Sequence, residues 1–130
     1  MVKSKQMQNT AKSPDNKHFL ETKKNWLGKL NSIISGQLHD PNLTIPKIAE
    51  ELYMSERQFY RRVKRETGYT PNQYLQVARL AKAKELLRAE KGITIKEAAM
   101  SVGYSRPDYF SKLFESYFGI RPVAFLRNCH

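Results

Sequence analysis

The chain has 130 residues, which is the length of one domain with a short extension. Its 40% hydrophobic content is enough for a buried core, and 23 lysine and arginine residues against 12 acidic ones give a net charge of +11. That excess favours a polyanionic partner. The single cysteine, Cys129, excludes an internal disulfide framework, and no apolar run is long enough for a membrane span. We therefore expect a basic cytoplasmic domain.

The chain begins with a polar stretch and continues into a helical pattern. Residues 1–15 lack periodicity and are expected to form a flexible basic tail, with residues 128–130 as a short C-terminal end. From about residue 16, apolar side chains recur at helical spacing until an Asp-Pro-Asn break at residues 40–42. The apolar positions of this helix are Leu20, Leu27, Leu30, Ile34 and Leu38. The folded domain is expected to cover residues 16–127.

A pair of short helices is expected next. Thr44 is the candidate N-cap of the first helix. Ser55, followed three residues later by Gln58, predicts a capping box that opens the second helix. Gly68 is the expected C-cap, because glycine adopts the left-handed conformation without strain. This first pair covers about residues 43–68.

A longer helix and a second pair follow. A threonine-proline start signal predicts a helix over residues 71–89. Thr94 predicts a further capping box, Ser105 is expected to begin the next helix, and Gly119 is expected to end it. The second pair therefore covers about residues 93–119. Since no segment alternates with a period of two, the predicted fold class is all-α, with about seven helices.

The two pairs repeat one another. The matching positions are Ala49, Leu52 and Ser55 with Ala99, Val102 and Ser105 at an offset of 50, and Phe59, Val63 and Gly68 with Phe110, Phe114 and Gly119 at an offset of 51. Each pair has the spacing of a helix-turn-helix, whose second helix, here called the reading helix, enters the major groove of DNA. One such pair occurs in any small helical domain, whereas two matched copies favour DNA binding. The helix between them spans about 28 Å, which suits two grooves about 34 Å apart.

Two stretches carry a family resemblance: SERQFYRRVKRETGYTPNQYLQVARLAKAKELL and ITIKEAAMSVGYSRPDYFSKLFESYFGIRP. They resemble the DNA-binding domain of the AraC/XylS family, and the resemblance covers about residues 19–127. It implies a bacterial transcription activator with two helix-turn-helix units joined by a helix, bound to double-stranded DNA and contacting RNA polymerase. The first unit also resembles output domains of hybrid two-component proteins, which implies an upstream sensing domain or protein outside this chain.

The first reading helix carries a basic run. Phe59 and Val63 must face the core, so the opposite side presents Arg57, Tyr60, Arg61 and Lys64. The resemblance implies that Arg57, Tyr60 and Arg61 face bases, and the arginine fork can bind O6 and N7 of guanine together. We assign phosphate contacts, in preference to a merely solvated flank, to Arg62, Lys64 and Arg65.

The second reading helix is close to neutral. The resemblance implies base contacts from Pro107, Asp108, Tyr109, Ser111 and Lys112. Lys112 stands where the family more often has arginine, so the bidentate contact is lost there. Asp108, three residues after Ser105, is also a candidate cap of the helix. We expect the first unit to supply most of the affinity and the second to supply weaker or shape-based discrimination.

The starts of helices and the two turns complete the expected site. Further phosphate contacts are assigned to Thr70, Arg106 and Arg121, with simple helix capping as the alternative for the first and last. The second turn has Gly103 where a left-handed residue is expected, but the first turn has Tyr53. A left-handed tyrosine would cost about 1 kcal/mol. Otherwise the first turn is distorted, and the angle of its reading helix changes.

Other classes of function fit the chain less well. His18, His39 and His130 are scattered, so we assign no catalytic residue, no metal ligand and no cofactor. The main alternative is a non-specific basic protein that binds nucleic acid and whose affinity falls steeply with salt. A helical protein-interaction module is a further alternative, but it has no use for the basic reading helix. Because one chain can contact two grooves, the domain is expected to be a monomer in solution.

Overall fold

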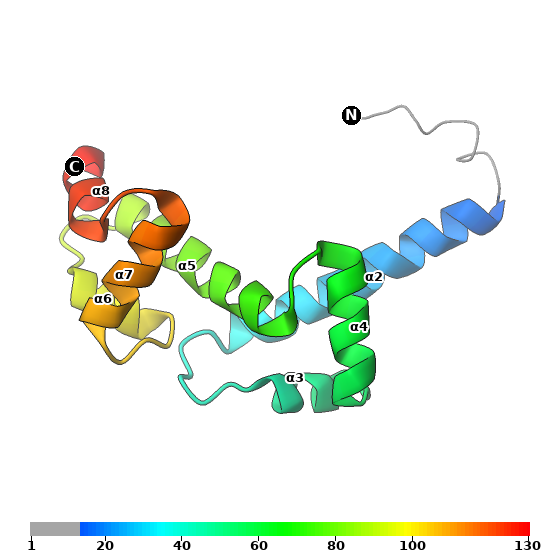
Figure 1. Cartoon of the computed structure of the whole chain (residues 1–130). Coiled ribbons are helices and arrows are strands. Elements are labelled where there is room, and N and C mark those ends of the chain that lie inside the picture. Colours follow the sequence, from blue (N-terminus) through cyan, green and yellow to red (C-terminus); the bar gives the residue numbers. More distant parts are fainter. Residues whose placement is uncertain (1–13) are drawn as a thin grey trace. The chain divides into compact units, whose positions relative to one another are not determined.

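A computed structural model describes residues 14–130, with side chains described from Asn25 onward. Its helices are α2 (Pro14–Gly36), α3 (Ile45–Glu51), α4 (Glu56–Thr67), α5 (Pro71–Ala89), α6 (Ile95–Ser101), α7 (Pro107–Phe118) and α8 (Pro122–Cys129). Since no strand occurs among the described residues, the all-α prediction is confirmed. The described residues divide into two compact units at residue 33, and both helix pairs lie in the second unit, residues 33–130 (Figure 1).

The first helix differs from its prediction at both ends. It begins at Pro14, inside the stretch predicted as a tail, because proline is well suited to the first turn of a helix. Residues 1–13 of that predicted tail lie outside the described residues. The helix ends at Gly36, so Leu38 lies in the following turn and not on the helix. Leu38 is nevertheless buried, in agreement with its apolar character.

The first helix pair forms as its caps predict. The Thr44 side chain accepts a hydrogen bond from the N–H of Lys47 and caps α3. In α4, the Gln58 N–H donates to Ser55 Oγ over 3.1 Å, and the Ser55 N–H donates to Gln58 Oε1 over 3.0 Å. Gly68 ends α4 with a left-handed φ of 81°. All three cap predictions for this pair are therefore confirmed.

The second pair is confirmed at its first cap and wrong at its second. Thr94 caps α6 in a capping box, as expected. The next helix, α7, begins at Pro107 and not at Ser105, with Arg106 as its N-cap residue. Proline disfavours the helical conformation in the residue before it, so Arg106 stays extended with φ −118° and ψ 104°. This longer lead-in accounts for the change of offset from 50 to 51 between the two pairs.

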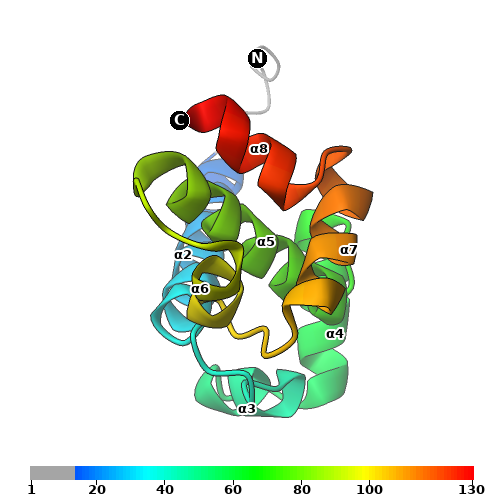
Figure 2. The same cartoon turned by 90° about the vertical axis from the view of Figure 1, so that its left-hand side faces the viewer.

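The long helix α5 is the scaffold for both pairs. It covers Pro71–Ala89, as predicted, and begins in a capping box between Thr70 and Gln73. It packs against α4, α6 and α8, while α3 packs on α4 and α7 packs on α6 and α8 (Figure 2). The buried cluster of the second pair consists of Leu80, Ala83, Leu87, Ala98, Ala99, Val102, Phe110 and Phe114. The buried residues of the first pair include Leu43, Ile48, Ala49, Phe59 and Val63.

Candidate DNA-binding site

The turns of the two helix pairs have the same backbone hydrogen bonds. In the first turn the Met54 N–H donates to the Ala49 carbonyl over 3.0 Å, and in the second the Tyr104 N–H donates to the Ala99 carbonyl over 2.9 Å. The residue before each of these donors also bonds back to the end of its helix. This paired pattern satisfies the free carbonyls at a helix C-terminus. Both pairs are therefore helix-turn-helix units with matching turns.

The left-handed position is occupied in both turns, by residues of very different size. Tyr53 has a φ of 58° and Gly103 a φ of 90°. Of the two alternatives for the first turn, the left-handed tyrosine is correct and the distorted turn is wrong. The Tyr53 side chain is 97% exposed, so packing does not offset the strain of about 1 kcal/mol in its backbone. The first turn is strained at one residue but keeps the same backbone hydrogen bonds as the second turn.

In the first unit, α4 divides its side chains as predicted. Phe59 and Val63 are buried, with exposed fractions of 1% and 0%. Arg57, Tyr60 and Arg61 are all exposed. These three residues come from two successive turns of one helix, so the structure brings them together on the surface of α4.

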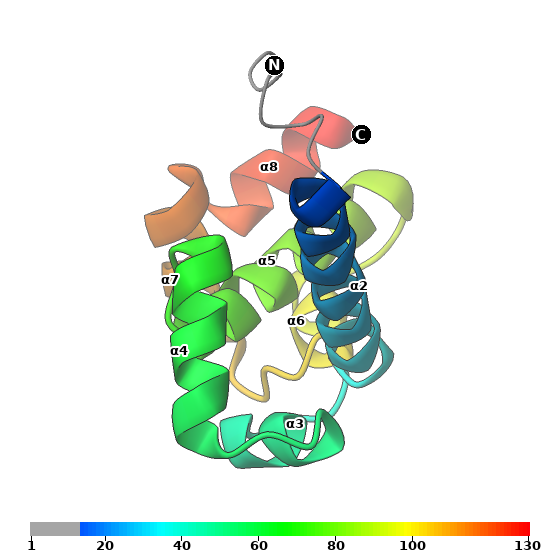
Figure 3. The same cartoon turned by 90° about the vertical axis from the view of Figure 1, so that its right-hand side faces the viewer.

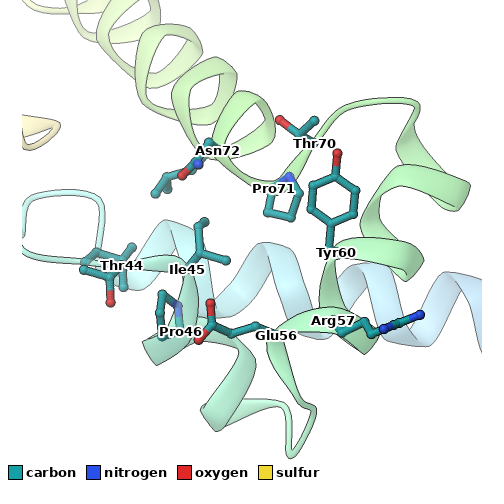
Figure 4. A pocket seen from close by; sticks show the side chains of 11 residues that line it. Thr44, Ile45, Pro46, Glu56, Arg57, Tyr60, Thr70, Pro71 and Asn72 are labelled. Carbon is teal, nitrogen blue, oxygen red and sulfur yellow. The ribbon is translucent and has the colours of Figure 1, made fainter.

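An open hollow of about 610 Å³ lies beside this surface. It is bordered by the first residues of α3, α4 and α5, and Figure 4 shows Tyr60 directed towards Thr70 and Pro71 at its edge. The first turns of these helices present backbone N–H groups that have no partner within the helix, which makes them suitable neighbours for a phosphate. Glu56 also lines the hollow and places a negative charge beside it. The Thr70 hydroxyl accepts from the Gln73 N–H over 3.2 Å, so it caps α5 as the alternative reading proposed.

The other basic residues of α4 have unequal surroundings. The Arg62 Nε lies 2.6 Å from a Glu66 carboxylate oxygen, and the Glu66 side chain is only 6% exposed. Arg65 lies 3.8 Å from the same carboxylate but remains 67% exposed. The Lys64 Nζ donates to the Gly68 carbonyl over 3.2 Å at the end of the helix. Arg62 therefore also compensates a buried charge, a role that the spacing of four residues could have indicated.

In the second unit, α7 presents a smaller and nearly neutral set. Tyr109 is 49% exposed, and Asp108 and Lys112 are also exposed, whereas Pro107 and Ser111 are half-buried. Arg106 donates to the Asp108 carboxylate over 3.1 Å. This bond, together with a backbone hydrogen bond at Tyr109, lowers the pKa of Asp108. The prediction that Asp108 caps the helix from Ser105 is wrong, because Ser105 lies outside α7.

The remaining predicted phosphate contact, Arg121, precedes α8. Its guanidinium lies 3.6 Å from the Glu115 carboxylate, and both side chains are well exposed. An exposed ion pair of this kind contributes little to stability, so the guanidinium is available to a stronger anionic partner. Because Glu115 belongs to α7, this ion pair also shows that the structure places Arg121 beside the helix that carries the other predicted residues of the second unit.

The two reading helices lie on a common side of the scaffold helix. Figures 2 and 3, which view the molecule from opposite sides, both show α4 and α7 on the same side of α5. The first lies towards the N-terminal end of α5 and the second towards its C-terminal end. Both reading helices thus lie on one side of the scaffold helix.

Among the residues that the structure describes, no helix combines the length and the apolar character of a membrane-spanning segment.

Comparison of the sequence with known proteins finds longer relatives that contain a similar segment. The protein named histidine kinase P4, from Formosa agariphila, is 30% identical over 99 residues, covering 76% of this chain and 7% of that protein. The transcriptional activator RhaS of Escherichia coli is 37% identical over 75 residues, covering 58% of this chain and 27% of that protein. The chain thus spans less than a third of the length of either relative.

Solved structures show the same fold. The DNA-binding domain of AdpA, a global transcriptional factor determined in complex with a target DNA, is 27% identical with a TM-score of 0.71, covering 78% of this chain and 90% of that chain. A family profile described as a helix-turn-helix domain matches residues 48–128. The chain therefore belongs to the AraC-type helix-turn-helix family, whose domains bind DNA and regulate transcription.

Proposed function

We propose that residues 33–130 bind a specific double-stranded DNA site with α4 in one major groove and α7 in the next, and thereby regulate transcription. The observation that carries this proposal is the placement of both reading helices on the same side of α5 (Figures 2 and 3). Successive major grooves face the same side of B-DNA about every 34 Å, and a 19-residue scaffold helix has a length of about 28 Å. One chain then performs the task that most helix-turn-helix proteins perform as dimers.

The proposed contacts follow from exposure and chemistry. On α4 the base contacts are those of Arg57, Tyr60 and Arg61. On α7 they are those of Pro107, Asp108, Tyr109, Ser111 and Lys112. Phosphate contacts are proposed for Arg62, Lys64, Arg65, Thr70, Arg106 and Arg121. Because Arg62 is engaged with Glu66, we propose that it approaches a phosphate while it keeps that ion pair.

The whole regulator extends beyond DNA binding. The relatives that are much longer than this chain include a protein named as a histidine kinase and another named as a transcriptional activator. These names support the proposal that the domain is the output part of a two-component activator, controlled by an upstream sensing domain and contacting RNA polymerase. Its place of action would be the bacterial cytoplasm, where the DNA is. The domain acts by binding, and catalysis has no part in this proposal.

Selection from a random duplex pool at physiological salt tests the proposed function. The bound fraction is sequenced, and two short enriched blocks about 10–11 bp apart are expected. One enriched block would contradict the two-groove mode. Binding without any enriched sequence would support the main alternative, a non-specific basic protein, and would appear together with a steep fall of affinity with salt.

A further inference from the structure

The guanidinium of Arg79 lies at the middle of α5 and is almost inaccessible to solvent. The residue is only 6% exposed, an unusual position for an arginine. Burial lowers the pKa of this guanidinium below its usual value, because desolvation disfavours the charged form. A charge that is buried at such cost must be compensated by hydrogen bonds. Its acceptors therefore show what the side chain holds in place.

All three hydrogen bonds of Arg79 go to backbone carbonyls. The Nη1 atom donates to the carbonyls of Leu38 and Val102 at a distance of 2.5 Å each, and Nη2 donates to the carbonyl of Asp40 at a distance of 3.1 Å. Leu38 and Asp40 belong to the segment that leads into the first helix-turn-helix unit, whereas Val102 ends α6 in the second unit. The planar fork of one guanidinium thus joins the end of α6, in the second unit, to the segment that leads into the first unit.

From these carbonyls the connection continues towards each reading helix. The Asp40 carbonyl also accepts from the Leu43 N–H over 3.2 Å, directly before the cap of α3. Val102 is followed by the turn that leads into α7. The most extensive contacts of the first pair, apart from those with α5, are between α3 and α4, and those of the second pair are between α6, α7 and α8. A side chain that joins the two backbones directly is therefore well placed to limit their relative movement.

The second turn is shaped to admit this guanidinium. A Cβ atom at Gly103 would collide with Arg79 Nη1 and would lie 2.6 Å from the Leu38 carbonyl oxygen. The left-handed φ of Gly103 is one reason for glycine, and this close approach is a second, independent one. At the matching position of the first turn, Tyr53 is fully accessible. The close approach thus occurs only in the second turn, where it meets Arg79 and the segment that leads into the first unit.

A second, exposed link joins the far ends of the reading helices. The hydroxyls of Tyr69, just after α4, and Tyr117, in the last turn of α7, lie 3.4 Å apart. Both side chains are substantially exposed, so water competes for this hydrogen bond. It is a weaker link than the buried guanidinium and serves as the matched comparison.

We propose that Arg79 is a positioning residue that fixes the distance and angle between the two reading helices, and thereby sets the spacing between the two DNA blocks that the domain recognises. This inference rests on the proposed two-groove binding. Arg79 touches no DNA in this scheme. It acts through the backbones of Leu38, Asp40 and Val102. Two rigidly connected reading helices gain affinity from each other only when both DNA blocks lie at the matching separation.

The test uses duplexes that carry both selected blocks at separations varied in single base pairs, and a duplex with the first block alone. Wild-type protein is expected to bind its best separation about 100-fold more tightly than the single block. Arg79→Lys keeps the charge but loses the fork, so this advantage is expected to fall to about 10-fold or less, with a flattened dependence on separation. Its affinity for the single block should stay within about 2-fold of wild type, because α4 is intact. Tyr117→Phe, the matched comparison, should retain the wild-type dependence.

An Arg79→Lys variant with the wild-type dependence on separation and unchanged affinity would overturn the inference. If the variant fails to bind even the single block, Gly103→Ala, which pushes on the same contact while keeping the arginine, is measured instead and is expected to flatten the dependence. An unflattened profile for that folded variant overturns the inference as well. If wild-type protein itself gains nothing from the second block, the two-groove proposal fails and the inference falls with it, which is a distinct result.

Discussion

In the first helix-turn-helix unit the left-handed turn residue is Tyr53, 97% exposed, whereas the matching residue of the second unit, Gly103, lies against Arg79 and Leu38. The two turns have the same hydrogen bonds and the same sign of φ. Backbone hydrogen bonds therefore set the form of the turn, while the neighbours decide which side chains it tolerates. The strained residue is found where space is free, and the unstrained one where space is absent.

The two reading helices have matching buried positions but different exposed side chains. Both have two buried aromatic or aliphatic side chains on the core side, Phe59 and Val63 in α4 and Phe110 and Phe114 in α7. The outward side of α4 is strongly basic, whereas that of α7 is balanced between acidic and basic groups. Core positions fix where a reading helix lies, but they leave its surface chemistry free to change. An internal repeat thus predicts equal geometry without predicting equal roles.

The largest effect is expected on the free energy of unfolding, from substitutions at the left-handed residue of each turn. Gly103→Ala should lower the free energy of unfolding by about 3 kcal/mol, because left-handed strain adds to the forced displacement of neighbours. Tyr53→Gly should instead raise it by about 1 kcal/mol or less, since strain is relieved while the unfolded chain gains freedom. Chemical denaturation followed by circular dichroism measures both. Equal destabilisation by the two substitutions would show that the turns are not distinguished by their neighbours.

The next effect concerns DNA affinity. Arg61→Ala should weaken binding to the selected duplex by about 2 kcal/mol, and Lys112→Ala by about 1 kcal/mol or less, because lysine lacks the bidentate contact with guanine. Both values come from titrations at one fixed salt concentration. A loss for Lys112→Ala that equals or exceeds the loss for Arg61→Ala would contradict the unequal roles of the two units.

A matched control separates these contacts from general charge effects. Lys91 belongs to the loop between α5 and α6, and Figures 2 and 3 show this loop on the opposite side of α5 from α4 and α7. Lys91→Ala removes the same unit of charge without touching the proposed DNA face. It should change affinity by less than about 0.5 kcal/mol at physiological salt, where charges beyond about 8 Å are screened.

A smaller effect on folding distinguishes two arginines of α4. Arg62→Ala should lower the free energy of unfolding by about 1–2 kcal/mol, because it leaves the nearly buried Glu66 carboxylate without its 2.6 Å partner. Arg65→Ala should change stability by less than about 0.5 kcal/mol, since that side chain is 67% exposed. If Arg62→Ala weakens DNA binding while stability is unchanged, the ion pair with Glu66 has no structural role.

Most of the fold could be predicted because the caps are local signals. Thr44, Ser55 and Thr94 each bond to a group within three residues, so a short sequence pattern contains the whole interaction. The same logic failed at Ser105, where a local capping pattern competed with the conformational restriction imposed by Pro107 and lost. Local signals predict reliably only where neighbouring residues do not contradict them.

Two missed features of the site, unlike the local Arg62–Glu66 ion pair, depend on distant parts of the chain. Arg79 bonds to carbonyls 23, 39 and 41 residues away, and a hydrogen bond to a backbone carbonyl leaves no pattern in the residue types. Tyr69 and Tyr117 meet across 48 residues for the same reason. Exposure of Arg57 and Arg61, by contrast, followed from helical periodicity alone. The exposed side chains of each unit could therefore be predicted from the sequence, whereas the hydrogen bonds that connect the two units could not.

The smallest effect is a pH dependence that belongs to the second unit alone. Burial raises the pKa of Tyr104 to about 12, whereas the matching residue of the first unit, Met54, does not titrate. In the unfolded chain a tyrosine ionises near pH 10, so the unfolded state loses its proton first and is favoured as the pH rises. The stability contributed by neutral Tyr104 is thus complete below pH 10 and is lost as the pH rises through about 12. Between pH 9 and pH 11 wild type should lose about 1 kcal/mol more than Tyr104→Phe in denaturant titrations. Parallel losses in the two proteins would mean that the hydroxyl ionises as freely in the folded domain as in the unfolded chain, and that the second turn is as open as the first.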